Sequence, residues 1–392
     1  MVSKFISETT TLPVAPLKVA ALEGCMDLAV KTDKHLVAQR KERSIVQHSP
    51  IEFKGYKSDS YLLKCHCPRF GSGEAKGVID ESVRGVDMFA MVDVGNYSLT
   101  YNVCGYENHM SPDDHYQDLK RIISASIAHA KRVNIIMPFL YEGRQHKRTK
   151  RESLDCALAL QELISMGVNN IITFDAHDPR IDNAIPLHGF DNYMPPYQFI
   201  RALLDVEKDL KIDNEHLMII SPDEGAMNRA VYFSNVLGVD MGMFYKRRDY
   251  STVVNGKNPI VAHEFLGSNV EGKDVIIVDD MISSGESMLD VAKQIKDRKA
   301  GKVIVCTTFG LFTDGLSKFD EYYEKGYINY VITTNLTYRT PELLKRPYYL
   351  EADMSKFIAL IIDTLNHDFS TEHVMSPTER IKALVKEYGG RV

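Results

Sequence analysis

The sequence lacks several features that would place it in a membrane-bound, secreted or zinc-binding class. No apolar run in its 392 residues approaches the length needed to span a bilayer, and the N-terminus lacks the long apolar core of a secretory signal. Its six cysteines include one close-spaced pair, Cys65 and Cys67, with no second pair to complete a zinc site. We therefore expect free thiols, a cytoplasmic location and no membrane partner.

Two further absences concern nucleic acids and nucleotides. The net charge is -6 at pH 7, which excludes a nucleic-acid binder of the basic type, so no nucleic-acid partner is expected. The sequence has no Gly-x-x-x-x-Gly-Lys-Ser/Thr loop, which argues against a P-loop kinase, and no Gly-x-Gly-x-x-Gly after a strand. Any phosphate site must therefore use another kind of loop.

What the sequence does contain is an alternation of apolar strands and helical patterns from residue 51 onward. The predicted strands are Asp87–Val92, Val133–Pro138, Asn170–Phe174, Leu217–Ile220, Met241–Tyr245, Asp274–Val278, Lys302–Thr307 and Tyr327–Thr333. Helical patterns lie between several of them, at His115–Ala130, Ser153–Met166, Gly225–Leu237 and Met288–Lys296. This alternation predicts an α/β fold with mainly parallel sheets flanked by helices.

The domain organisation follows from where this alternation begins and pauses. Helical periodicity from Leu17 to Lys41 predicts a partly helical N-terminal extension over residues 1–48. The dipeptide Pro195-Pro196 marks either a boundary between two α/β domains of similar size or the start of a helix. The expected segments are therefore the extension, α/β domains at 49–194 and 195–360, and a C-terminal helical segment at 361–392.

One stretch, Val275–Ser287, combines a strand, an acidic pair, a turn and a helix start. Val275–Val278 is a continuous apolar run, typical of a strand covered on both faces. The small residues from Ser283 to Ser287 suit a turn into a helix, whose free N–H groups favour phosphate. Asp279 and Asp280 could hold Mg²⁺ or bind sugar hydroxyls. The alternative is an ordinary N-cap beside solvated acids.

Charged residues also follow four other predicted strands, at the sheet edge where ligands bind in α/β folds. The groups are Asp175 with His177, Asp223, Lys246 with Arg248, and the basic segment Arg144–Arg151. Their mixture of acids and bases predicts a polyphosphate ligand with a hard divalent metal.

Each group has a structural alternative as well. Asp175 and Asp223 could cap local structure, with His177 satisfied nearby. Lys246 and Arg248 could belong to a solvated basic loop. The segment Arg144–Arg151 could clamp nucleotide phosphates or contact a neighbouring subunit, with RNA contact the weaker alternative.

Taken in order, these groups resemble motifs of the ribose-phosphate pyrophosphokinases, also called phosphoribosyl pyrophosphate (PRPP) synthetases. Val275–Ser287 resembles the PRPP-binding loop that this family shares with type I phosphoribosyltransferases. The other matching pieces are Arg69–Glu74 (adenine loop), Glu81–Gly85, Arg144-Gln145 (ATP clamp), Asp175–His177, Ser221–Asp223, Lys246–Arg248 and Thr333–Asn335. The resemblance covers about residues 50 to 370.

The resemblance implies transfer of the β,γ-diphosphoryl group of ATP to the 1-hydroxyl of ribose 5-phosphate, giving PRPP and AMP. It implies two phosphoribosyltransferase-type domains with the active site between them, in a homo-oligomer (dimer or hexamer). The implied ATP-binding residues are Phe70, Ser72, Glu74, Arg144, Gln145 and His177, with His177, Asp175 and Asp223 near Mg²⁺. Those implied for ribose 5-phosphate are Asp279, Asp280, Ser283, Ser284, Gly285, Glu286 and Ser287, and the catalytic pair is Lys246 and Arg248.

The sequence departs from the family pattern at several places. In the PRPP-type loop Ser283 replaces an acid and Glu286 replaces a small residue, and a carboxylate there would repel a sugar phosphate unless it points away. Ser72 replaces an asparagine, and Gly95–Asp113 is longer than the corresponding connection. The altered loop motivates one alternative, a non-catalytic regulatory homologue. The other is a PRPP-consuming phosphoribosyltransferase, which leaves the adenine loop unexplained.

Overall fold

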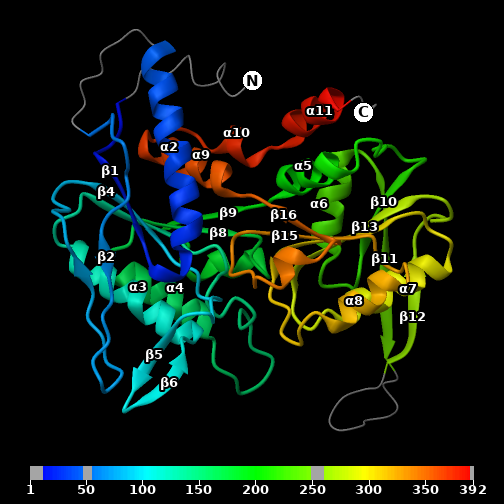
Figure 1. Ribbon diagram of the computed structural model, residues 1–392, viewed down its shortest axis with the longest axis horizontal. Helices are drawn as coiled ribbons and strands as arrows, with labels where there is room; N and C mark the ends of the chain where they lie inside the picture. Colours follow the sequence, from blue (N-terminus) through cyan, green and yellow to red (C-terminus); the bar gives the residue numbers. More distant parts are fainter. Residues whose placement is uncertain (1–11, 47–54, 249–259, 389–392) are drawn as a thin grey trace. The chain divides into compact units, whose positions relative to one another are not determined.

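The computed structural model describes residues 12–46, 55–248 and 260–388 (Figure 1). The chain divides into two compact units. The first holds the described residues up to Met194 together with Asn335–Tyr338 and Met354–Met375. The second holds the remainder, beginning at Pro195. The break coincides with the Pro195-Pro196 dipeptide, and helix α5 (Pro196–Val206) also begins there.

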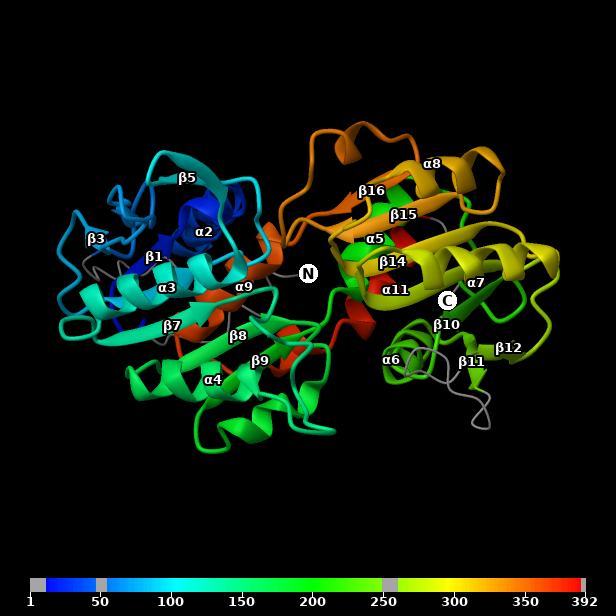
Figure 2. The same ribbon diagram turned by 90° about the horizontal axis from the view of Figure 1, so that it is seen from below.

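The first unit is built on a five-stranded sheet in the order β1-β4-β7-β8-β9, with every pair parallel. Helices α3 and α4 cover one face and α2 and α9 the other (Figure 2). Its strands are β1 (Leu17–Ala21), β2 (Cys65–His66), β3 (Val78–Ile79), β4 (Asp87–Met91), β5 (Thr100–Val103), β6 (Tyr106–His109), β7 (Arg132–Ile136), β8 (Asn170–Phe174) and β9 (Gly189–Tyr193). Its helices are η1 (Glu23–Cys25), α2 (Met26–Val46), α3 (Pro112–Ser126), α4 (Asp155–Ser165), η2 (Pro179–Ala184), α9 (Ser355–Asn366) and α10 (Glu372–Met375).

The second unit is built on a seven-stranded sheet in the order β12-β11-β10-β13-β14-β15-β16. Its β11–β12 pair is antiparallel and the other pairs are parallel. Helices α5 and α6 lie on one side of the sheet and α7 and α8 on the other (Figure 1). Its strands are β10 (Leu217–Ser221), β11 (Asp240–Arg248), β12 (Ile260–Leu266), β13 (Asp274–Ile282), β14 (Val303–Gly310), β15 (Tyr330–Thr334) and β16 (Tyr349–Ala352). Its helices are α5, α6 (Met227–Leu237), α7 (Glu286–Asp297), α8 (Ser317–Glu324), η3 (Leu343–Lys345) and α11 (Thr378–Glu387).

The predicted fold class is confirmed, since both sheets are mainly parallel and flanked by helices. All eight predicted strands and all four predicted helices are present, with ends shifted by a few residues. Their apolar runs are buried, as in Val275–Val278 of β13. No helix in the described part of the chain is long and apolar enough to cross a membrane.

The expectation that residues 1–48 form an extension outside the α/β domains is wrong for the described part of that segment. Leu17–Ala21 forms β1, which pairs with β4 along its whole length. Val19 also donates its N–H to Tyr61 O at 2.8 Å, so β1 is bonded on both sides. The helical periodicity begins later, at Met26. Leu, Lys and Ala have high intrinsic helix propensities, but pairing with β4 overrides that preference here.

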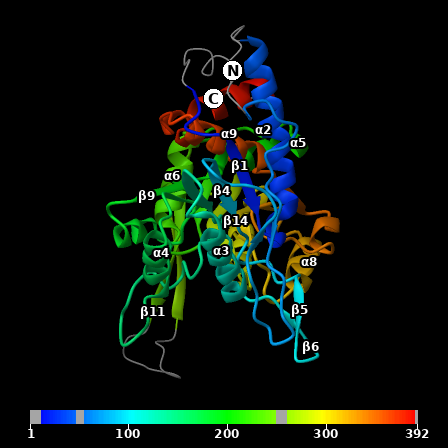
Figure 3. The same cartoon turned by 90° about the vertical axis from the view of Figure 1, so that its left-hand side faces the viewer.

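Helix α2 lies against α9 within the first unit (Figure 3). A buried ionic cluster joins the two helices. Arg40 Nε lies 2.9 Å from Asp363 Oδ1, and Arg43 Nη2 lies 2.6 Å from Asp363 Oδ2. The expected boundary at residue 361 therefore falls inside a single helix, α9, which belongs to the first unit. Helix α11 belongs to the second unit, so the expected C-terminal segment is divided between the two.

Candidate active site

The loop predicted to bind adenine is a tight turn with an exposed aromatic residue. Phe70 N–H donates to Glu74 O at 2.7 Å, and Gly73 N–H donates to Phe70 O at 2.9 Å. Ser72 Oγ donates to Glu74 Oε2 at 2.9 Å. The Phe70 side chain is 53% exposed, so its ring is available to stack on a base. The structure thus brings Phe70, Ser72 and Glu74 together in one turn.

The predicted ATP-clamping pair lies in the loop after β7. Arg144 is exposed, and Gln145 donates its side-chain amide to Ser153 O at 2.7 Å. The next residue, His146, is mostly buried, and its Nε2 lies 3.3 Å from Asp178 Oδ2. Burial lowers the pKa of His146 despite the nearby carboxylate, so we expect a neutral ring at pH 7.

His146 connects this loop to the end of β8, where Asp175 and His177 were predicted. The rings of His146 and His177 lie 5.4 Å apart, and His177 is exposed. Asp175 is buried, and its φ of 43° places it in the left-handed region. Hydrogen bonds from Arg180 lower the pKa of Asp178 to about 2 and keep that carboxylate ionised. Sequence reasoning missed His146 and Asp178, although each directly follows a predicted site residue.

The acidic pair lies at the carboxyl end of β13, in the second unit. Asp280 is buried, and its N–H donates to Asp279 Oδ1 at 2.8 Å. Burial and then the charge of Asp280 raise the pKa of Asp279 well above its usual range. Arg229 Nη1 lies 3.4 Å from Asp279 Oδ1 and offsets part of this negative charge. Arg229 was not predicted, although it lies in the first turn of α6, shortly after Asp223.

The loop after the acidic pair leads into α7 as predicted. Gly285 is the N-cap, with a φ of 81° that favours glycine. Ser284 Oγ accepts a weak hydrogen bond from Glu286 N–H at 3.4 Å. Ser283 O accepts from Thr313 N–H at 3.0 Å, which ties the loop to the segment after β14.

Glu286, the residue that could repel a sugar phosphate, has a cationic partner. Its carboxylate is paired with Lys318 of α8, and its side chain is 65% exposed. The hydrogen bond and charge of Lys318 lower the pKa of Glu286. Nothing in the local sequence indicated this pairing, because Lys318 lies on a different helix.

Two other predicted groups follow strands of the same sheet. Asp223 lies just beyond β10, and its Oδ1 accepts from Gly225 N–H at 2.9 Å. Strand β10 is parallel to β13 and pairs with it from Leu217 to Ile220, so Asp223 and Asp279 follow neighbouring carboxyl ends. Lys246 and Arg248 lie at the end of β11, where they pair with His263 and Ile260 of β12. The backbones of these predicted site residues in the second unit therefore lie at the same edge of its sheet, where the parallel strands β10, β11 and β13 end.

The donors suit a hard cation held jointly with phosphate oxygens. Among the described residues, no three His, Cys, Asp or Glu side chains are grouped to hold a metal by themselves. Mg²⁺ is usually bound by one or two carboxylates together with substrate phosphates and water, so a complete protein cage is not needed. Asp223 after β10, and Asp175 with His177 after β8, would each supply one or two such ligands.

All six cysteines are free thiols, as expected from the sequence.

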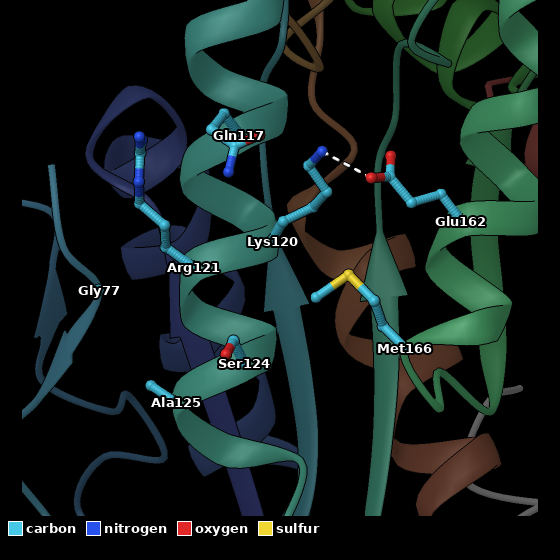
Figure 4. Close-up of a pocket in the computed structure, with 8 residues that line it drawn as sticks. All are labelled: Gly77, Gln117, Lys120, Arg121, Ser124, Ala125, Glu162 and Met166. Atoms are coloured by element: carbon cyan, nitrogen blue, oxygen red, sulfur yellow. Dashed lines mark hydrogen bonds and ion pairs between the residues drawn. The ribbon is translucent and has the colours of Figure 1, made fainter. Parts of the chain in front are cut away.

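A surface groove of about 490 Å³ lies elsewhere in the first unit, between α3 and α4 (Figure 4). Lys120 Nζ, which lines it, lies 2.8 Å from Glu162 Oε1. Arg121, a second lining cation, lies 2.5 Å from Asp118 Oδ1. Both cations are paired with carboxylates, and none of the lining residues is a predicted site residue.

Comparison with known proteins gives matches to both units. The family model for the N-terminal domain of ribose phosphate pyrophosphokinase matches residues 17–167, and the phosphoribosyl transferase domain matches residues 198–336. The ribose-phosphate pyrophosphokinase of Thermosipho africanus is 32% identical over 259 residues, which is 65% of this chain and 73% of the relative. That of Mycoplasma genitalium is 26% identical over 315 residues, which is 79% of this chain and 85% of the relative.

A solved structure extends the likeness to the fold. The crystal structure of phosphoribosylpyrophosphate synthetase from Mycobacterium smegmatis matches with a TM-score of 0.69 at 21% identity. The match covers 90% of this chain and 99% of that chain. The first family model begins at residue 17, the first residue of β1, which agrees with the place of β1 in the sheet.

Proposed function

The chain belongs to the ribose-phosphate pyrophosphokinase family, and we propose that it is a ribose-phosphate diphosphokinase. It transfers the β,γ-diphosphoryl group of ATP to the 1-hydroxyl of ribose 5-phosphate and releases PRPP and AMP. The main support is that one chain carries both family domains in order, and that the predicted motifs other than the Phe70–Glu74 turn and Glu81–Gly85 follow strands of the two main sheets.

The proposed roles divide between the two units. In the first, Phe70 stacks on adenine, Ser72 and Glu74 contact its edge, and Arg144 and Gln145 hold the ATP. In the second, Asp279 and Asp280 bind ribose hydroxyls, while residues 283–287 cradle the 5-phosphate through N–H groups and hydroxyls at the start of α7. The pairing of Glu286 with Lys318 supports this role, because it offsets the negative charge beside the phosphate.

Catalysis of this kind needs positioning and charge neutralisation, without a covalent intermediate. Lys246 and Arg248 stabilise negative charge on the diphosphoryl group during transfer. His177, Asp175 and Asp223 are the proposed contacts of Mg²⁺, which would neutralise charge on the triphosphate when bound. Asp175 is buried and has a positive φ, so its backbone also fixes the strand end that carries His177.

The two alternatives are less well supported. A PRPP-consuming transferase would leave the match of residues 17–167 and the Phe70 loop without a role. A regulatory homologue was suggested by the altered residues 283–287. The cationic partner of Glu286 supports a loop that accepts a phosphate, because it offsets the carboxylate's charge. The expected homo-oligomer, a dimer or a hexamer, stays a prediction that sedimentation velocity can check.

The first test is AMP and PRPP formation from ATP, Mg²⁺ and ribose 5-phosphate. We expect both products with the wild type and a loss of about 10²–10³-fold in kcat with Lys246→Ala, because a cation near the transferred group is removed. Lys325→Ala is the matched control, since Lys325 forms an exposed pair with Glu321 on α8 and should keep full activity.

Failure of the proposed reaction has a clear signature. If the wild type binds ATP yet forms no AMP, the regulatory homologue becomes the better explanation. If it consumes PRPP and releases pyrophosphate with a base or amine, the transferase alternative replaces the proposal.

A further inference from the structure

We propose that the β5–β6 hairpin is a specificity element for the nucleotide base, because it clamps the Phe70–Glu74 turn in place. The clamp consists of Tyr101, Val103 and the backbone of Cys104, packed against residues 69–74. The proposal rests on the proposed function in one respect, the assignment of this turn to the base of ATP. The hairpin, β5 (Thr100–Val103) and β6 (Tyr106–His109), lies within the segment Gly95–Asp113.

The turn is held directly by the tip of the hairpin. Cys104 N–H donates to Gly71 O at 2.8 Å, which joins the two backbones at the centre of the turn. Val103 packs against Gly73 so closely that a Cβ on Gly73 would lie 2.9 Å from Val103 Cγ2. The second half of the turn therefore has no room to shift toward the hairpin.

The residue before the turn is held by the same hairpin. The Arg69 guanidinium lies 4.8 Å from the centre of the Tyr101 ring, a cation–π contact. Arg69 also donates two hydrogen bonds to Asp118, at 3.1 and 2.8 Å. This bidentate geometry fixes the plane of the guanidinium, so Arg69 bridges the hairpin and α3.

The hairpin is itself anchored, so it can act as a fixed support. Tyr101 Oη donates to Asp114 Oδ1 at 3.1 Å. Asp114 forms the capping box of α3 with Ser111, so its carboxylate is already oriented. The two strands meet in a Cys104-Gly105 turn with φ values of 50° and 89°, the combination that matches the twist of a tight hairpin.

These contacts make the position of Phe70 dependent on the hairpin. Stacking on an aromatic ring tolerates any base, because every base has a π-face. Discrimination instead requires polar groups at fixed positions, here Ser72 and Glu74. Loosening the turn should therefore weaken ATP binding and also reduce the preference for adenine over guanine.

The test compares two tyrosines of the same hairpin in the full-length protein. Tyr101→Ala removes the ring under Arg69 and the bond to Asp114, and Tyr106→Ala is the matched control at a side chain that is 77% exposed. We expect Tyr101→Ala to raise KM for ATP by about 5–10-fold and to lower the ATP/GTP ratio of kcat/KM. We expect kcat, KM for ribose 5-phosphate and the melting temperature to change little. Tyr101→Phe, which keeps the ring, should have a smaller effect than Tyr101→Ala.

The inference is overturned if Tyr101→Ala and Tyr106→Ala have the same KM for ATP, or if kcat and the melting temperature fall together while the ATP/GTP ratio stays constant. Titration calorimetry with ATP separates this failure from failure of the proposed reaction. If the wild type binds ATP without forming AMP, weaker binding by Tyr101→Ala still supports the clamp. If the wild type does not bind ATP, both proposals fall.

Discussion

At the scale of single residues, Gly285 is the position with least tolerance in the proposed phosphate loop. Its φ of 81° lies in the left-handed region, and a Cβ there would lie 2.3 Å from Cζ of the buried Phe319. A side chain at this position would therefore meet both a backbone penalty and a collision with the core of the second unit.

We predict that Gly285→Ala lowers the free energy of unfolding by roughly 2–5 kcal/mol, the sum of these two costs. Gly272→Ala separates them, because Gly272 has a similar φ of 78° but open space around it. That control should lose about 1–2 kcal/mol. Urea unfolding of both variants makes the comparison, and equal losses would show that Phe319 moves aside without cost.

Some residues of the candidate site could be predicted from the sequence, and others could not. The acidic pair, the Ser-Gly turn and the helix after it were predictable because they are contiguous and their apolar context sets the strand. Arg229 and Lys318 were not, because both contacts depend on packing. Arg229 meets Asp279 of β13 only after α6 has packed on the sheet, and Lys318 meets Glu286 only after α7 and α8 have both packed. The charge of Glu286, which alone would repel a phosphate, can thus be judged only once its partner Lys318, on another helix, is known.

At the scale of elements, the contact between α2 and α9 depends on one buried carboxylate. Asp363 is 2% exposed and lies between Arg40 and Arg43. Burial alone would raise the pKa of Asp363, but the charges of Arg40, Arg43 and His367 outweigh it and leave the pKa below its usual value. The contribution to stability is therefore complete above the ordinary carboxyl pKa of about 4 and is lost as pH falls through the lower folded value.

We predict that Asp363→Asn destabilises the first unit by about 3–5 kcal/mol at pH 7, because two buried cations lose their counter-charge. The gap between variant and wild type should begin to narrow below about pH 4, where the unfolded carboxylate becomes protonated, and should close as the pH falls through the lower pKa of folded Asp363. Asp59→Asn is the control, since Asp59 is fully exposed in its pair with Lys41 and should have little effect. A gap that stays constant with pH would contradict the assigned ionisation of Asp363.

Strands at interior positions of the two main sheets were predictable from their apolar runs, and strands at the edges were not. The interior strands are β4, β7, β8, β10, β11, β13, β14 and β15, and most of their residues are buried. Strand β1 was predicted to be helical, because its five residues include good helix formers. It forms a strand because its backbone hydrogen-bonds to β4 on one side and to Tyr61 on the other. The β5–β6 hairpin was noticed only as extra length, because its exposed, polar strands have no apolar pattern.

At the scale of the whole molecule, the N-terminal segment from residue 12 onward supplies a strand and an ionic contact to the first unit. Deleting residues 1–45 would remove β1, which is almost entirely buried, and would leave Asp363 without Arg40 and Arg43. We predict that this truncation unfolds the first unit, because the lost burial and pairing are comparable with the total stability of a domain, about 5–15 kcal/mol.

Hydrogen exchange tests this truncation within one sample. Amides of β4 and β7 should lose protection, while those of β13 and β14 should keep it. An unchanged sedimentation coefficient and melting temperature would instead mean that the segment is a dispensable addition to the fold.

The interleaving of the two units has a consequence for the order of events during synthesis. The first unit contains α9, at Ser355–Asn366, and its α2 closes on Asp363 of that helix. The ribosome must therefore translate nearly all of the second unit before the first can complete its core. During that interval Arg40 and Arg43 lack the carboxylate of Asp363. The N-terminal part of the chain is therefore synthesised early but reaches its final packing late.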